Sequence, residues 1–154
     1  MLSETTLTAI RAALFVALDG RDTPIPLTEI AARLDAAPAY LSKVNTALVK
    51  GGVFRSHRGV RGGVTLERGP ELITLLDIVE ACQGKILGDY CAEHDNLAQV
   101  CAFHEAMHQL REKVVATLTG WTLADMMARP EPCRALRDRV NCRVAAAARA
   151  RKRR

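Results

Sequence analysis

Apolar residues recur every three or four positions in several segments of the 154-residue chain, a spacing that predicts α-helices. The first three predicted helices are Thr5–Leu18, Leu27–Leu34 and Ala39–Lys50. Residues 35–38 form the turn between the second and the third. The pair Gly51-Gly52 is expected to end the third helix, because glycine adopts a left-handed C-cap at low cost.

Two short strand-like segments follow, Val53–Ser56 and Val64–Leu66, joined by a basic, glycine-rich stretch that indicates a hairpin tip. The order of helix, short turn, helix and basic hairpin is typical of a winged helix-turn-helix. In that fold the second helix of the pair enters the major groove of DNA, and the hairpin reaches the backbone or the minor groove. The sequence therefore predicts a mainly α fold with a small β-hairpin wing.

The second half of the chain is predicted to be helical. Its expected helices are Thr74–Cys82, the long segment Cys101–Leu118, and a short helix that Thr122 caps before Pro130. Residues 84–100 show no regular pattern.

Charge is distributed unevenly along the chain. The formal net charge is +5, but residues 131–154 hold nine basic and two acidic residues, so residues 1–130 are slightly acidic. Within them, residues 37–68 carry six basic residues against Glu67 alone: Lys43, Lys50, Arg55, Arg58, Arg61 and Arg68. This segment is a candidate polyanion-binding face, although a solvated basic surface would have the same charge.

Composition limits the setting of the protein. No apolar run reaches the roughly 20 residues that a membrane helix needs, and the first residues lack the features of a signal peptide. We therefore expect a soluble, cytoplasmic protein with no membrane partner. Five cysteines in such a chain favour metal binding, redox chemistry or simple burial over a disulfide framework.

Several segments, in this order and spacing, resemble the Rrf-two family of bacterial winged-helix repressors, which includes iron–sulfur, nitric-oxide and cysteine-metabolism regulators. The segments are Ala39–Val44, Gly51–Val53, Ser56–Leu66, Ile73–Ala81 and Trp121–Asp125. The resemblance covers most of residues 1–128 and leaves out the basic tail.

The resemblance implies a homodimer whose long helices cross, so that two recognition helices lie one DNA turn apart on double-stranded DNA with a palindromic operator. It also implies a sensor loop before the long dimerisation helix. The resulting division is a winged helix-turn-helix DNA-binding domain at 1–70, a sensor loop with dimerisation helices at 71–130, and a basic flexible tail at 131–154.

Candidate DNA-contacting residues lie in the third helix and the hairpin. They are Tyr40, Ser42, Lys43, Arg58, Gly59, Arg61, Gly62 and Gly63. The three glycines would let the backbone approach DNA and adopt positive φ. By resemblance, Arg58 matches the wing arginine that enters the minor groove. Tyr40 could instead be a half-buried packing residue and Lys43 a solvated lysine. Val64 stands where relatives usually have an aromatic residue.

Cys91, Cys101 and His104 resemble the ligands of the family's iron–sulfur cluster, of the 2Fe-2S or 4Fe-4S type, which some members lack. Thiolates and a neutral imidazole suit such a cluster or zinc. No middle cysteine stands between Cys91 and Cys101, so a fourth ligand must come from elsewhere: His94, Cys82, His108 or Glu4. For Cys82 a buried thiol in the core is the favoured interpretation, and Cys133 and Cys142 look unrelated to the site. Uncoordinated thiols, or a thiol switch between Cys91 and Cys101, are the alternatives.

The sequence thus predicts a dimeric, DNA-binding transcriptional repressor and not an enzyme. It would sense iron–sulfur status, nitric oxide or redox state through Cys91, Cys101 and His104. Two rival hypotheses remain. One is a small hydrolase with zinc on the same three residues. The other is a nucleic-acid-binding adapter without a sensor, which would bind through the basic tail.

Overall fold

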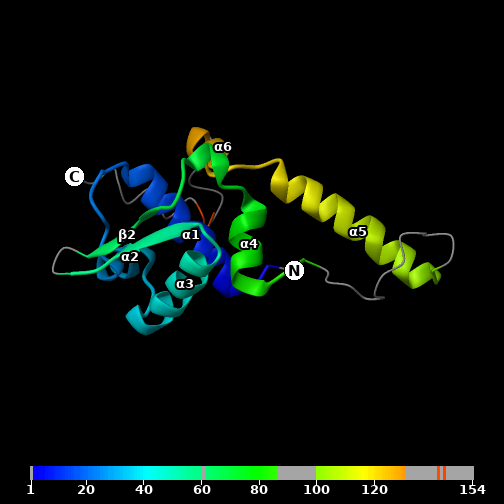
Figure 1. Ribbon diagram of the computed structural model, residues 1–154, viewed down its shortest axis with the longest axis horizontal. Coiled ribbons are helices and arrows are strands. Elements are labelled where there is room, and N and C mark those ends of the chain that lie inside the picture. Colours follow the sequence, from blue (N-terminus) through cyan, green and yellow to red (C-terminus); the bar gives the residue numbers. More distant parts are fainter. Residues whose placement is uncertain (1, 60–61, 87–99, 131–141, 143, 145–154) are drawn as a thin grey trace.

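The computed structural model describes residues 2–59, 62–86, 100–130, 142 and 144. Its helices are α1 (Glu4–Asp19), α2 (Leu27–Leu34), α3 (Pro38–Lys50), α4 (Leu75–Gln83), α5 (Ala102–Thr119) and α6 (Leu123–Ala128) (Figure 1). The strands are β1 (Phe54–His57) and β2 (Gly63–Leu66), and a 3-10 turn spans Pro70–Leu72. Helix α2, the turn, helix α3 and the β1–β2 hairpin confirm the winged helix-turn-helix. Each predicted element lies within a residue of its observed bounds; the 3-10 turn was not predicted.

Short-range hydrogen bonds fix several helix ends. The Ser3 hydroxyl accepts from the backbone N–H of Thr6 at the start of α1. Thr74 and Thr122 each form a capping box with the aspartate three residues later, Asp77 and Asp125, at the starts of α4 and α6. Each box satisfies backbone donors that the helix itself leaves unpaired.

Helix α1 is the centre of the hydrophobic core. It contacts α2, α3, α4, α6 and β2 and is buried on most of its circumference. A helix covered on all sides needs small and apolar residues throughout, and the alanine-rich sequence of α1 supplies them. Ile73, Ile78 and Leu123 join the same cluster, so one core includes residues from both sides of residue 70.

The wing is anchored to this core. In the antiparallel register Phe54 faces Leu66 and His57 faces Gly63. The backbones of Ile25 and Val64 exchange two hydrogen bonds of 2.9 Å, so the segment before α2 pairs with β2. Because Phe54 and Val64 are buried, the hairpin has a fixed base beside the helix-turn-helix.

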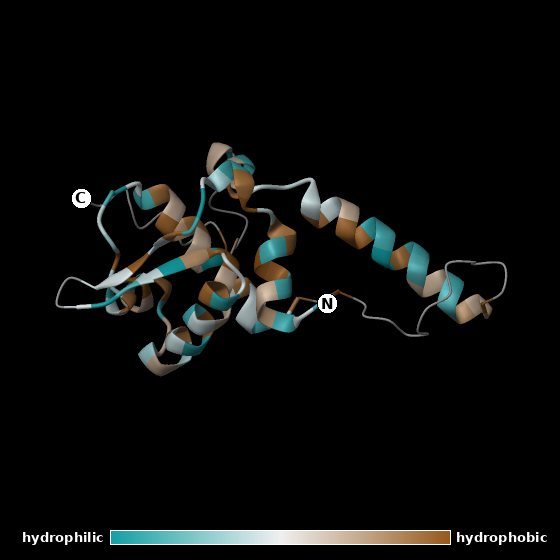
Figure 2. Ribbon diagram, viewed as in Figure 1, coloured by the Kyte–Doolittle hydropathy of each residue, from teal (hydrophilic) through white to brown (hydrophobic). Residues whose placement is uncertain are grey.

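Helix α5 differs from the others because none of its 18 residues is buried. It contacts α4 and otherwise projects from the body of the molecule (Figure 1). Hydrophobic and hydrophilic residues alternate along its ribbon (Figure 2). Among the described residues, no helix combines the length and apolar character needed to cross a membrane.

Candidate DNA-reading surface and sensor residues

One side of α3 packs on the core and the other is open. Leu41, Val44 and Leu48 are buried, at helical spacing. Ser42 and Lys43 lie on the exposed side, together with Thr46 and Lys50. The Thr46 hydroxyl donates to the Ser42 carbonyl at 2.9 Å. The exposed side of α3 therefore presents hydroxyls and two cations on a helix that the core holds firmly in place.

Tyr40 lies at the edge of this surface and not at its centre. Its ring is half-buried and packs against the core cluster. Its hydroxyl donates to Thr5 Oγ1 at 3.4 Å, a long contact that leaves the oxygen free to accept or exchange a bond. The packing role suggested from sequence is thus present.

Arg11 contributes to the helix-turn-helix and was missed from the sequence. From α1 it reaches the turn, where its Nη2 donates to the Leu34 carbonyl at 3.0 Å. This bond satisfies a carbonyl at the C-terminus of α2, just before Asp35 adopts the left-handed conformation with φ 51°. A single arginine inside the apolar, alanine-rich α1 segment was the available signal.

The wing tip needs its glycines for different reasons. Arg58 is exposed, and the following Gly59 has φ 107°; a β-carbon added there would meet no atom of the described residues within 4 Å. The N–H of Gly62 donates to the Gly59 carbonyl at 2.9 Å. Arg61 lies outside the described residues.

The expectation of a positive φ is wrong for Gly63, whereas Gly59 does adopt one. A β-carbon at Gly62 would lie 2.6 Å from the His57 carbonyl oxygen, and one at Gly63 would overlap the Ile25 carbonyl. These two residues are small because the chain packs on itself at the base of the tip, which leaves Gly59 as the open glycine.

Ion pairs reduce the basic face expected from the sequence. Arg55 donates twice to Glu67, at 2.7 and 3.0 Å, and Arg68 lies 2.9 Å from Asp77. The Arg55 guanidinium lowers the pKa of the Glu67 carboxyl below its ordinary 4.5, mainly by hydrogen bonding. Among the described residues, Lys43, Lys50 and Arg58 are the cations of this segment for which no ion pair is found.

The sensor residues are placed in part. Cys101 is exposed at the N-cap of α5, and His104 lies one turn further on. Cys91 and His94 lie outside the described residues. Within the described part of the chain, no three histidine, cysteine or acidic side chains are grouped so that they could hold a metal ion.

The remaining candidate ligands are spread over other elements. Cys82 is half-buried on α4 against the core, and burial raises the pKa of its thiol, so it is a poor thiolate donor. Glu4 lies in the first turn of α1, and His108 lies one turn beyond His104 on α5. Cys142 is half-buried, whereas Cys133 lies outside the described residues.

Comparison with known proteins identifies the family. The Rrf2 (Rrf-two) family, described as "Iron-dependent Transcriptional regulator", matches residues 2–129. The HTH-type transcriptional regulator IscR of Yersinia enterocolitica is 30% identical over 128 residues, covering 77% of this chain and 74% of that protein.

Two solved structures show the same architecture. CymR, the global cysteine regulator of B. subtilis, superposes with a TM-score of 0.67 at 25% identity, covering 83% of this chain and 96% of that one. IscR of T. potens superposes with a TM-score of 0.66 at 24% identity, covering 85% and 88%. These relatives are transcriptional regulators and not enzymes. The chain therefore belongs to the Rrf2 family of transcriptional regulators.

Proposed function

We propose that the protein binds double-stranded DNA through α3 and the wing, acting as a homodimeric repressor in the cytoplasm. The observation that carries this proposal is the pairing of an exposed, cationic side of α3 with an anchored hairpin whose tip presents Arg58. A helix of this kind suits the major groove, and an arginine on a narrow tip suits the minor groove.

The proposed division of labour follows from the side chains. Ser42 and Lys43 lie early on α3, where they can reach base edges or phosphates, and Tyr40 can offer its hydroxyl to a phosphate while its ring stays packed. Arg58, Gly59 and Arg61 would form the contact at the tip. Gly62 and Gly63 support this tip through backbone packing.

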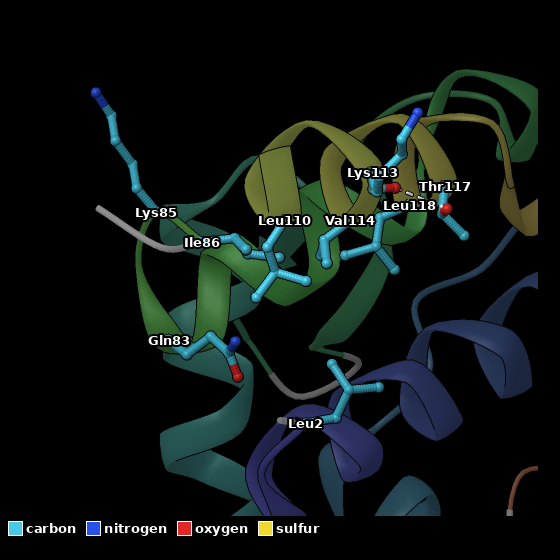
Figure 3. Close-up of a pocket in the computed structure, with 9 residues that line it drawn as sticks. All are labelled: Leu2, Gln83, Lys85, Ile86, Leu110, Lys113, Val114, Thr117 and Leu118. Carbon is cyan, nitrogen blue, oxygen red and sulfur yellow. Dashed lines mark hydrogen bonds between the residues drawn. The ribbon is translucent and has the colours of Figure 1, made fainter. Parts of the chain in front are cut away.

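The exposed apolar residues of α5 are the evidence for the proposed dimer. Phe103 is 60% exposed and Leu110 44% exposed on a helix with no buried residue. A groove of about 470 Å³ lies between α5, the end of α4 and Leu2. Leu110, Val114 and Leu118 point into it toward Leu2, whereas the amines of Lys85 and Lys113 point away (Figure 3). An apolar face of this kind on a projecting helix fits the same face of a second copy.

A two-fold dimer would present two copies of α3 to DNA. Its operator would then be palindromic, with half-sites one helical turn apart. Leu110→Glu places a charge in the groove and should convert dimer to monomer in sedimentation equilibrium. Gln109→Glu adds the same charge at the neighbouring residue, outside the groove lining, and should leave the dimer intact. A dimer that survives Leu110→Glu would exclude this interface.

The proposed sensor consists of Cys91, Cys101 and His104, with a fourth ligand from elsewhere. The donor set fits an iron–sulfur cluster in chemistry: Cys101 is exposed, and the Nδ1 of His104 has no hydrogen-bond partner among the described residues. When bound, such a cluster would supply sensitivity to oxidation and to nitric oxide. The chain's part is to supply these donors from the segment that follows α4 and from the start of α5.

The path from the sensor to DNA would run through α4. Residues 87–99 follow α4, whose end is held by a 3.2 Å hydrogen bond from the Ile86 N–H to Glu80. Helix α4 also packs directly on α3. Ligand binding at the sensor would therefore bias the position of α4 and, through it, the spacing of the two copies of α3.

Anaerobic purification with visible absorption, iron and sulfide analysis tests the sensor. We expect a chromophore that Cys91→Ala or Cys101→Ala abolishes and His104→Ala makes more labile. Cys133→Ala and Cys142→Ala are matched controls that should leave it unchanged. Absence of iron and sulfide, with DNA binding unaffected by oxidant, would exclude cluster sensing while leaving DNA binding standing.

A further inference from the structure

Two histidines occupy successive turns of α5. His104 and His108 are four residues apart, so an α-helix places their β-carbons about 5–6 Å apart on one face. Both side chains are half-buried, and the Nδ1 atom of each is shielded from solvent with no hydrogen-bond partner among the described residues. A carboxylate oxygen of Glu112, one turn further on, lies 3.9 Å from His108 Nδ1, beyond hydrogen-bond range.

Shielded ring nitrogens without hydrogen-bond partners are uncommon in folded proteins, and a bound cation would give both nitrogens a partner. Two imidazoles on adjacent turns of a helix can also bind one cation together, as a bidentate ligand. Among first-row divalent cations, the late ones bind neutral imidazole most strongly. Cu²⁺ binds most tightly, and Ni²⁺ and Zn²⁺ bind less tightly than Cu²⁺. We propose that His104 and His108 form a chelating site for such a cation, with Zn²⁺ as its physiological representative.

The rest of the coordination shell follows from the neighbours. Because no third donor is grouped with the pair in the described part of the chain, water would fill the remaining positions of Zn²⁺. Glu112, whose carboxylate lies 3.9 Å from His108 Nδ1, is near enough to accept a hydrogen bond from water bound to the cation. The site requires neither Cys91 nor Cys101. Only its competition with the cluster for His104 rests on the proposed function.

Cation binding would also act on α5 itself. This helix has no buried residue, so packing within one chain contributes little to its stability. A cation that bridges two adjacent turns binds the helical form more tightly than the unfolded one, and therefore stabilises it. The site would thus couple divalent-metal supply to the order of the helix that we propose for the dimer.

Zn²⁺ titration followed by histidine side-chain NMR tests the proposal. The full-length Cys91→Ala/Cys101→Ala variant is used, because it lacks two of the proposed cluster ligands. The imidazole signals of His104 and His108 should shift together with one midpoint. His57, whose Nε2 lies 2.9 Å from Thr65 Oγ1 in the wing, should not follow them.

His108→Gln in the same background should weaken Zn²⁺ binding at His104 by at least tenfold, because the chelate is lost. His57→Gln is the matched control and should leave the midpoint unchanged. An unaltered His104 midpoint in His108→Gln would overturn the proposal, as would an absence of paired shifts. Failure of cluster sensing has a different signature, namely wild-type protein without iron and sulfide.

Discussion

Gly51, which caps the C-terminus of α3, lies so close to Ala81 of α4 that a β-carbon at residue 51 would overlap the Ala81 methyl. The φ of Gly51 is −81°, which any residue can adopt. The requirement at this position is therefore space and not conformation. The contact joins the proposed recognition helix to the helix that leads to the proposed sensor residues.

Gly51→Ala should destabilise the protein by about 1–3 kcal/mol, because the added methyl forces α3 and α4 apart. Ala81→Gly alone should cost about 1 kcal/mol through helix propensity. The double variant should lose less stability than the sum of the two single losses, since the space lost at residue 51 is restored at residue 81. Urea unfolding of all four proteins measures this coupling. Strictly additive losses would show that the contact is not tight.

The Glu67 carboxyl should titrate below its ordinary pKa of 4.5, because Arg55 donates two hydrogen bonds to its ionised form. A lowered folded-state pKa means that the pair's stabilisation is present above pH 4.5 and is lost as the pH falls through the lowered value. Both side chains are exposed, so we expect a small effect on stability.

Arg55→Gln should return the pKa of Glu67 toward 4.5 in an NMR pH titration. Arg68→Gln is the matched control, because Arg68 pairs with Asp77 and should leave Glu67 unchanged. A Glu67 pKa that does not respond to Arg55→Gln would remove this ion pair from the wing.

The elements were predictable from sequence because their signals are local. The helical spacing of Leu41, Val44 and Leu48 and the Thr122–Asp125 capping box both depend on residues within a few positions of one another. The reasons for Gly62 and Gly63 were not predictable in this way. They come from carbonyls of His57 and Ile25, which only the folded hairpin brings close.

The candidate site shows the same limit. Charge counting over residues 37–68 could not show that Arg55 and Arg68 are paired, because Asp77 lies outside that window and the cross-strand register sets the Glu67 contact. Arg11 was missed because its partner is a backbone carbonyl 23 residues away. In contrast, the exposed side of α3 followed directly from helical spacing.

Arg58→Ala should weaken binding to the operator by about 1–3 kcal/mol if the side chain reads the minor groove. Binding to random duplex should fall much less. Arg111→Ala, an exposed arginine on α5, is the matched control for loss of one positive charge. Titrations at fixed salt provide the comparison. If Arg58→Ala and Arg111→Ala lose equal operator affinity, Arg58 acts only through its charge and does not read the groove.

Removal of residues 131–154 should weaken specific and random binding by similar factors. These residues hold nine basic and two acidic side chains, and a cationic tail acts mainly through counterion release. The salt dependence should become shallower by about 0.9 for each phosphate that the tail neutralises. Titration of full-length and truncated protein at several salt concentrations checks this. Loss of specificity with unchanged random binding would assign base reading to the tail.

The central claim is that a homodimer reads DNA sequence through the α3 helix and the wing of each copy. Selection of bound duplexes from a random library by the full-length protein, followed by sequencing, tests it most directly. We expect enrichment of a palindrome whose half-sites lie one helical turn apart, at about 10 base pairs, and loss of that enrichment with Arg58→Ala. Recovery of the library without enrichment, or of an asymmetric site that Arg58→Ala does not affect, would contradict the account.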